Sequence, residues 1–167
     1  MMRPWLRYLL YALPALPLYL PLFSYVTPFY ASERGVDLAA LGLAWIGIRM
    51  FDAVSDPLAG WASDRTARRI GRRGWILLAA PLIAVATWQA FVPPGDAGLA
   101  HAVLWLFLLT LGWTLAQTPY YAWGAELEEG YAARTRVTAW RETMVLGGTL
   151  LATILYFLGG EGGEGLR

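Results

Sequence analysis

The sequence contains no cysteine and no lysine, and His101 is its only histidine. Without cysteine the chain can form neither a disulfide nor a thiolate metal site. With a single histidine, neither a two-histidine metal site nor an enzyme with a histidine relay is expected. The 13 basic and 12 acidic residues leave a net charge of +1, so no overall charge attracts the chain to nucleic acid.

Charged residues are scarce as well. Of the 167 residues, 15% are charged and 57% are hydrophobic, and the mean hydropathy is +0.45. Because a soluble domain usually has about 25% charged residues, this composition is typical of a protein with several membrane spans. The lipid bilayer is therefore the first predicted partner of the chain.

Five apolar runs are each long enough to cross a bilayer, which takes about 20 helical residues. The predicted spans are residues 8–30, 38–63, 75–92, 99–125 and 139–158. The first run is longer than the apolar region of a signal peptide, and no A-x-A site follows it, so it is predicted to be a span. The sequence thus predicts an all-α membrane protein with a single membrane domain over residues 1–167.

Polar segments separate the predicted spans, and their arginines indicate how the chain is oriented. The predicted connections are residues 31–37, 64–74, 93–98 and 126–138. Nine of the thirteen arginines lie in the N-terminal residues and in the second and fourth connections, namely Arg3, Arg7, Arg65, Arg68, Arg69, Arg72, Arg73, Arg134 and Arg136. Because arginines accumulate on the cytoplasmic side, the N-terminus is predicted to be cytoplasmic and, with five spans, the C-terminus outside.

The second predicted span carries three charged residues inside an apolar run. In a helix with about 100° per residue, one narrow face is shared by Arg49, Asp52, Asp56 and Gly60. Asp52 lies about 21 Å into this span, so both aspartates are expected near or just past the midplane of the bilayer. Charges at that depth are costly and usually mark an ion or substrate pathway.

The charges of Arg49, Asp52 and Asp56 sum to −1, which attracts one monovalent cation or one proton in a low-dielectric site. Two carboxylates one helical turn apart offer oxygen ligands that suit a hard cation such as Na⁺. The prediction is therefore a Na⁺ or H⁺ site. The alternative is a buried ion-pair cluster that serves only helix packing.

The fourth predicted span has a polar amide among aromatic side chains. The residues that share or flank one helix face there are Trp113, Gln117, Tyr120, Tyr121, Trp123 and Gly124. A sugar can stack its C–H face on such rings while the amide of Gln117 binds its hydroxyls. The alternative is an aromatic belt at the membrane interface.

Two aspartates in a membrane helix would also be compatible with an enzyme. The D-G-x-x-A-R opening of membrane alcohol phosphotransferases is absent, however, and so is the G-x-S-x-G motif of a serine hydrolase. We therefore expect no enzyme activity, and no cofactor other than the coupling ion.

Three motifs in combination resemble one family. The first begins at Arg49 and reads R-x-x-D-x-x-x-D-P-x-x-G, followed by D-R-T-x-x-R-x-G-R-R and a tryptophan. The others are TPYYAWGAEL and Y-x-x-R-T-R-V-T-A-W-R-E. Together they resemble the glycoside–pentoside–hexuronide:cation symporters, the melibiose-permease-like branch of the major facilitator superfamily. The resemblance implies two six-helix bundles and alternating access, with this chain as the first five helices of a carrier in the bacterial inner membrane.

The resemblance also implies a cation site and a solute site. In this family two aspartates of the second helix bind the cation; they correspond to Asp52 and Asp56, with Arg49 as their charge partner. Gln117 stands where melibiose permease has an aspartate that contacts sugar, and Arg141 corresponds to an arginine that helps to bind sugar. The predicted solute-binding residues are Trp113, Gln117, Tyr120, Tyr121 and Arg141.

The connection between the second and third spans resembles the superfamily's cytoplasmic conformational latch. The predicted latch residues are Gly60, Asp64, Arg65, Gly71, Arg72 and Arg73. The expected function is therefore cation-coupled transport of a sugar or glycoside-like solute, with the missing C-terminal helices of the same carrier as partners. A polar face needs further helices to enclose it, so the chain is expected to be a fragment. The alternative is a truncated or non-transporting membrane protein that acts only as a helix-packing partner.

Overall fold

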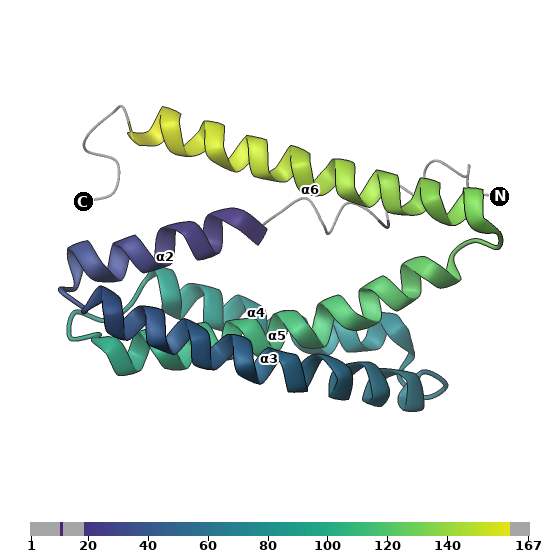
Figure 1. Cartoon of the computed structure of the whole chain (residues 1–167), viewed down its shortest axis with the longest axis horizontal. Helices are drawn as coiled ribbons and strands as arrows, with labels where there is room; N and C mark the ends of the chain where they lie inside the picture. The colour runs from purple at the N-terminus through teal and green to yellow at the C-terminus, as the bar shows by residue number, and fades with distance from the viewer. Residues whose placement is uncertain (1–10, 12–18, 161–167) are drawn as a thin grey trace. The chain divides into compact units, whose positions relative to one another are not determined.

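The computed structural model describes residue 11 and residues 19–160, and within these residues the chain is all-α (Figure 1). The helices are Tyr19–Glu33 (α2), Leu38–Thr66 (α3), Gly71–Phe91 (α4), Leu99–Glu126 (α5) and Tyr131–Gly160 (α6). The all-α class predicted from the sequence is confirmed. Much of the first predicted span, with Arg3 and Arg7 before it, lies outside the described residues.

The chain divides into two compact units. One unit is Val26–Trp123, which holds the second half of α2, all of α3 and α4, and most of α5. The other unit combines Met1–Tyr25 with Gly124–Arg167 and holds α6. The predicted cation site, the amide of Gln117 and the predicted latch all belong to the unit Val26–Trp123.

Local chemistry explains where α2 ends and α3 begins. Gly35 has a φ of 61°, in the left-handed region that favours glycine. The next residue, Val36, is buried and donates its N–H to the carbonyl of Tyr30 at 3.1 Å, which satisfies one of the carbonyls of the last turn of α2. Asp37 then caps α3 by accepting hydrogen bonds from the N–H groups of Ala39 and Ala40 at 3.3 and 3.2 Å.

Two predicted connections are too long. The predicted connection 64–74 is wrong at both ends, because α3 continues to Thr66 and α4 begins at Gly71. The predicted connection 126–138 is wrong in its second half, because α6 begins at Tyr131. Arginine and alanine are good helix formers, and long arginine side chains can reach water from a helix that continues past the apolar region. Charge marks the membrane boundary here, not the end of the helix.

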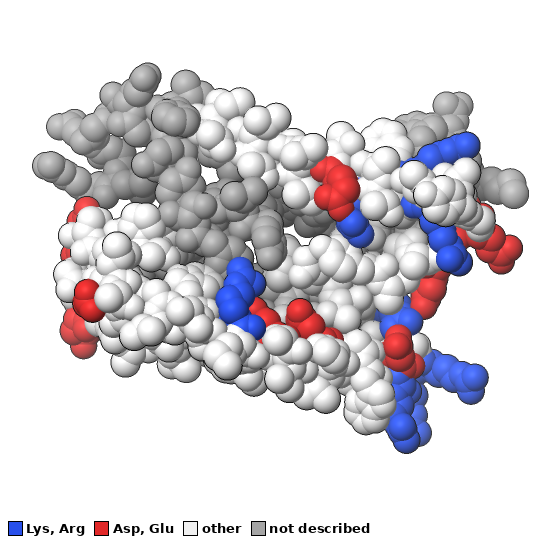
Figure 2. Space-filling model, in the orientation of Figure 1, with Lys and Arg blue, Asp and Glu red and all other residues white. Residues whose placement is uncertain are grey.

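Three of the described helices, α3, α4 and α5, are long and apolar enough to cross a membrane. They correspond to the second, third and fourth predicted spans. The first and fifth spans stay predictions. Most of the described surface in Figure 2 is white, and its blue and red atoms are gathered in a few groups, as expected when apolar helix faces contact lipid.

The core of the unit Val26–Trp123 lies between α2, α3 and α5. Its buried apolar side chains are Val26, Tyr30, Val36, Leu41, Ile48, Ala102 and Leu106. Glycines let α5 approach α3 and α4 closely. A Cβ on Gly60 of α3 would lie 3.5 Å from Thr118 Cγ2 of α5. A Cβ on Gly112 of α5 would lie 3.0 Å from Ile83 Cγ1 of α4. This close packing fixes the face of α3 that carries Asp52.

Candidate functional site

The inward face of α3 carries one carboxylate. The buried residues of this helix are Leu41, Ile48, Asp52, Ser55, Ala59 and Ser63, which recur every three, four or seven positions. Such spacing places them on one stripe of the helix. Asp52, only 8% exposed, therefore lies among apolar and small side chains of the packed face.

The carboxylate of Asp52 is only partly compensated. Arg49 Nη1 lies 3.4 Å from Asp52 Oδ2, a long single contact within one helix turn. The other oxygen, Oδ1, is buried and has no hydrogen-bond partner among the described residues. The side chain of Arg49 is 54% exposed, against 12% for that of Asp52. A buried anion with one unfilled oxygen is costly unless a proton or a cation joins it.

Arg49 is in turn positioned by α2. Its guanidinium carbon lies 5.9 Å from the centre of the Trp45 ring, one turn earlier in α3. The indole Nε1 of Trp45 donates a hydrogen bond to Thr27 Oγ1 of α2 at 3.0 Å. Trp45 and Arg49 share a helix face because they are four residues apart, but the sequence gives no signal for the contact of Trp45 with Thr27.

Asp56 lies one helical turn after Asp52 but in a different environment. The two side chains leave α3 about 40° apart around the helix axis. Asp56 is nevertheless exposed, whereas Asp52 is buried. Ser55, between them, is buried and its hydroxyl donates a long hydrogen bond of 3.4 Å to the carbonyl of Asp52. A buried carboxylate and an exposed carboxylate thus lie one turn apart on the same helix.

The predicted solute-binding residues of α5 form a connected group. Gln117 Nε2 donates a hydrogen bond to Tyr121 Oη at 2.6 Å. The rings of Tyr120 and Tyr121 are 5.9 Å apart and tilted by 45°. Tyr120 is buried and Tyr121 is exposed, and Trp113 is partly buried one turn before Gln117. The group offers an amide carbonyl and an exposed ring on one side of α5.

Arg141, the remaining predicted solute-binding residue, lies in α6 and so in the other unit. Its guanidinium contacts Glu142 Oε1, and its side chain also donates a hydrogen bond to Tyr11. Tyr11 packs so closely on Gly124 that a Cβ there would overlap its ring. Sequence reasoning missed Tyr11, because no motif links it to the distant Arg141. It assigned no role to Glu142, although the third motif contains this residue. The meeting of Arg141 with Gln117 at one solute site stays a prediction.

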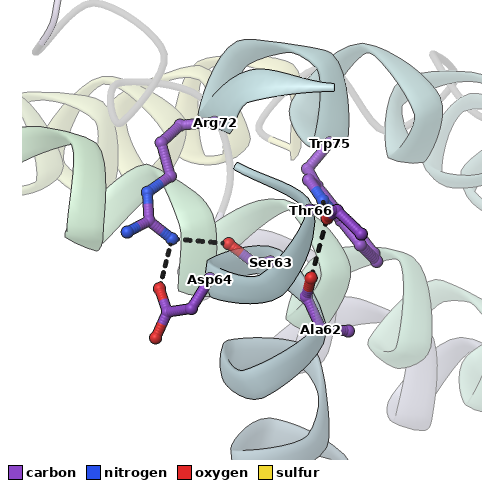
Figure 3. Close-up of polar contacts among 6 residues, drawn as sticks. All are labelled: Ala62, Ser63, Asp64, Thr66, Arg72 and Trp75. Atoms are coloured by element: carbon purple, nitrogen blue, oxygen red, sulfur yellow. Dashed lines mark hydrogen bonds and ion pairs between the residues drawn. The ribbon is translucent and has the colours of Figure 1, made fainter. Parts of the chain in front are cut away.

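The predicted latch contains a direct ion pair between Arg72 and Asp64. Figure 3 shows Arg72 of α4 reaching back to the end of α3, where its Nη1 lies 2.6 Å from Asp64 Oδ1 and 2.8 Å from Ser63 Oγ. Nearby, Trp75 Nε1 donates to Thr66 Oγ1 at 2.8 Å. These contacts hold the end of α3 against the start of α4. Gly71 begins α4 with a φ of 73°, which allows the sharp turn between the two helices.

The other predicted latch residues make different contacts. Arg65 stacks on Trp61, with its guanidinium carbon 5.3 Å from the ring centre, and Arg73 stacks on Trp123 at 4.6 Å. Gly60 lies against Thr118 of α5. Sequence reasoning did not assign Trp61 or Trp123 to this region. Asp64 and Arg72 thus form an ion pair of the latch, and Arg65 and Arg73 lie at its exposed side, each stacked on a tryptophan.

The comparisons with known proteins identify the family of the chain. The profile of the family described as MFS/sugar transport protein matches residues 8–160. The chain is 32% identical to the inner membrane symporter YicJ of Escherichia coli (strain K12) over 104 residues, which are 60% of this chain and 23% of YicJ. It is 32% identical to the uncharacterized symporter YnaJ of Bacillus subtilis (strain 168) over 109 residues, which are 63% of this chain and 24% of YnaJ.

No solved structure matches the chain. The chain spans about a quarter of the length of the symporters it matches, 23% of YicJ and 24% of YnaJ. The family match nevertheless extends over all five described helices. The resemblance drawn from the motifs is confirmed: the chain is an integral membrane protein that belongs to the MFS/sugar transport protein family.

Proposed function

We propose that the chain is part of a cation-coupled carrier that moves a sugar or glycoside-like solute across the bacterial inner membrane by alternating access. Its N-terminus faces the cytoplasm in this proposal. Na⁺ or H⁺ binds at Asp52 and Asp56, with Arg49 as charge partner. The observation that carries the proposal is the buried carboxylate of Asp52, of which one oxygen has no hydrogen-bond partner among the described residues.

The proposal follows from the charge balance along α3. One arginine and two aspartates leave one negative charge in the apolar stretch of a helix long enough to span the membrane. A cation or a proton removes that charge, so the occupied helix face can be enclosed at lower cost than the empty one. The ion thereby changes which carrier conformation is more stable, and this is the requirement for coupling.

The solute is proposed to bind at the aromatic group of α5. Gln117, with its amide held by Tyr121, can bind sugar hydroxyls, and the exposed ring of Tyr121 can stack on a sugar face. Arg141 is proposed to join them from α6. The family description, which names sugar transport, supports this class of solute. Further helices of the carrier would enclose the rest of the site.

The latch supplies the proposed conformational switch. The contact between Arg72 and Asp64 is short, yet 68% of the Asp64 side chain is exposed. The Asp64 carboxylate can therefore return to water at low cost when a carrier changes state, while Arg72, whose side chain is 14% exposed, keeps its contact with Ser63. Asp64 and Arg72, extended by Arg65 and Arg73, are therefore proposed to connect in one state and separate in the other.

The cation site can be tested on the purified chain in lipid nanodiscs. The unfolding free energy is compared in NaCl and in choline chloride at equal ionic strength, across a series of pH values. For a Na⁺ site, a salt concentration of about 100 times Kd stabilises the fold by about 2.7 kcal/mol. For a proton site, the wild-type chain instead gains stability relative to Asp52→Asn as the pH falls.

Matched variants identify the residues. Asp52→Asn and Asp56→Asn are expected to lose the response to Na⁺ or pH, because each removes one carboxylate of the site. Asp96→Asn is the control, because Asp96 is an exposed aspartate in the turn between α4 and α5. Equal responses of all four proteins would refute the proposed ion site.

The second candidate function is a membrane protein that only packs against other helices. The contact between Arg49 and Asp52 favours it, because this pair partly compensates the buried carboxylate without any ion. For that function the wild-type chain is expected to show no Na⁺ response and no pH response beyond that of Asp52→Asn. The same unfolding measurements therefore decide between the two candidates.

A further inference from the structure

The turn between α3 and α4 has a strong excess of positive charge. Residues 64–73 contain one acidic residue, Asp64, and five arginines, which gives a net charge of +4. Asp64 pairs with Arg72, and the four other arginines are exposed: Arg65, Arg68, Arg69 and Arg73. In Figure 2, blue atoms protrude at the lower right, where Figure 1 draws the turn between these helices.

Three of these arginines have no acidic partner within the described part of the chain. No carboxylate lies within ion-pair distance of Arg65, Arg68 or Arg69 there. Arg65 stacks on Trp61, and Arg73 stacks on Trp123. Exposed charges of one sign that lie this close together repel one another and attract a counter-ion. The surface is therefore suited to an anionic group supplied from outside the described chain.

An apolar stripe leads directly to this basic surface. The exposed large side chains along one side of α3 are Leu43, Met50, Val54, Leu58 and Trp61. Their spacing of three, four or seven residues makes them one continuous stripe. Arg65 occupies the next position, one turn after Trp61, which is itself 60% exposed. The order along the helix is thus apolar chain, indole ring, guanidinium.

We propose that this surface binds one anionic phospholipid. Its phosphate lies against Arg65, Arg68 and Arg69, its glycerol region lies at Trp61, and one acyl chain follows the stripe towards Leu58 and Val54. The sequence of apolar, aromatic and basic side chains matches the order of acyl chain, interface and phosphate in a bilayer. The site does not depend on the proposed transport function.

The same observations favour a lipid over a soluble anion or a zwitterionic lipid. The stripe belongs to α3, which is long and apolar enough to cross a membrane, so an acyl chain is available along its whole length. A soluble phosphate would leave the stripe unused. A phosphatidylcholine head group carries its own cation and cannot neutralise the net charge of +4 on residues 64–73. A phosphatidylglycerol head group, with one net negative charge, lowers this charge to +3.

The affinity can be measured by native mass spectrometry of the purified 167-residue chain with equal concentrations of phosphatidylglycerol and phosphatidylcholine. The wild-type chain is expected to hold one phosphatidylglycerol in preference to phosphatidylcholine. Arg68→Gln/Arg69→Gln is expected to lower the phosphatidylglycerol affinity by about fivefold for each arginine removed. The matched control is Arg134→Gln/Arg136→Gln, which removes two exposed arginines of α6. It is expected to leave the affinity within about twofold of wild type, because neither arginine is among the proposed phosphate-binding residues.

The position of the lipid can be tested by fluorescence quenching with dibrominated phosphatidylglycerol. Trp61→Phe is expected to remove the part of the quenching that is specific to this lipid, because its bromine atoms lie along the stripe next to Trp61. The matched control is Trp88→Phe, because Trp88 is an exposed tryptophan near the end of α4 that is remote in sequence from the basic turn. The control is expected to keep the specific quenching.

Three results would overturn the proposal. Equal binding of the two lipids by the wild-type chain would exclude a preference for the anionic head group. An equal loss in the Arg68/Arg69 and Arg134/Arg136 variants would show a general effect of charge and not a site. Displacement of phosphatidylglycerol by inorganic phosphate at the same concentration would assign the surface to soluble anions.

Discussion

Replacing Arg34 with methionine is expected to loosen the turn between α4 and α5 while the turn between α3 and α4 keeps its stability. Arg34 follows the last residue of α2, and its guanidinium binds three consecutive carbonyl groups of that turn. Nη1 donates to the carbonyls of Pro94 and Gly95 at 3.0 and 2.9 Å, and Nη2 donates to that of Pro93 at 3.2 Å. One side chain thus connects the end of α2 to the turn between α4 and α5.

The size of the effect follows from these three hydrogen bonds. Each hydrogen bond contributes about 0.5–1.5 kcal/mol net, and bonds exposed to water lie at the lower end. Two of the three bonds are exposed and one is partly buried, so we expect a total loss of about 2 kcal/mol. If the turn opens locally, this loss raises the equilibrium constant between the open and the closed turn by about 30-fold. Arg34→Lys keeps the charge and one donor position, and it is expected to lose about half of the free energy.

Hydrogen exchange followed by mass spectrometry measures this opening directly. The informative amide is that of Ala97, which donates to the carbonyl of Pro94 at 3.0 Å within the same turn. Arg34→Met is expected to speed its exchange by about 30-fold, while the amide of Arg69, bonded to Thr66 at 2.9 Å in the other turn, exchanges at its wild-type rate. Unchanged exchange at Ala97, or equal acceleration at both amides, would refute the role of Arg34 as a local clamp.

Three further outcomes test the packing and the proposed sites. Gly112→Val is expected to destabilise the fold by about 1–3 kcal/mol, because its Cβ would lie 3.0 Å from a side chain of α4. The control is Gly147→Val, because nothing lies within 4 Å of a Cβ at Gly147. Equal unfolding midpoints of the two variants would contradict the packing. Asp64→Asn is expected to cost less than about 1 kcal/mol in unfolding free energy, because 68% of the Asp64 side chain is exposed. A larger loss would argue against a latch that breaks easily. Gln117→Ala is expected to weaken binding of nitrophenyl glycosides, followed by tryptophan fluorescence, by up to about tenfold without changing the cation response; equal losses would make Gln117 a scaffold residue.

The sequence predicts helices best where local chemistry ends them. The starts of α3 and α5, at Leu38 and Leu99, coincide with the predicted spans 38–63 and 99–125. Asp37 caps the first of these helices, and the proline and glycine residues of 93–98 precede the second. The start of α6 was predicted wrongly, because an apolar window detects the membrane boundary, and arginine and alanine continue a helix beyond it.

In the candidate site, contacts within one helix could be predicted from the sequence, whereas contacts between distant segments could not. The contact of Arg49 with Asp52 could be predicted, because residues three positions apart on a helix are always neighbours. The contact of Trp45 with Thr27, the clamp of Arg34 on the carbonyls of Pro93–Gly95, and the packing of Tyr11 on Gly124 could not be predicted. Each of them joins segments that are distant in sequence, and the positions of such segments depend on how whole helices pack.

The difference between Asp52 and Asp56 explains how one helix could bind an ion and also respond to it. Asp52 lies on the packed face of α3, and its contact with Arg49 ties it through Trp45 to α2. Asp56 is exposed one turn later, and it lies on the same side of the buried face of α3 as Arg49. An ion bound between them would be held by the buried carboxylate of Asp52 and by the solvent-exposed carboxylate of Asp56. Any helix that encloses Asp56 would then gain most from packing there when the ion is present, because enclosing the empty pair would bury an uncompensated charge. In this view, coupling between ion binding and closure needs no special pathway through the protein and follows from the unequal burial of two neighbouring aspartates.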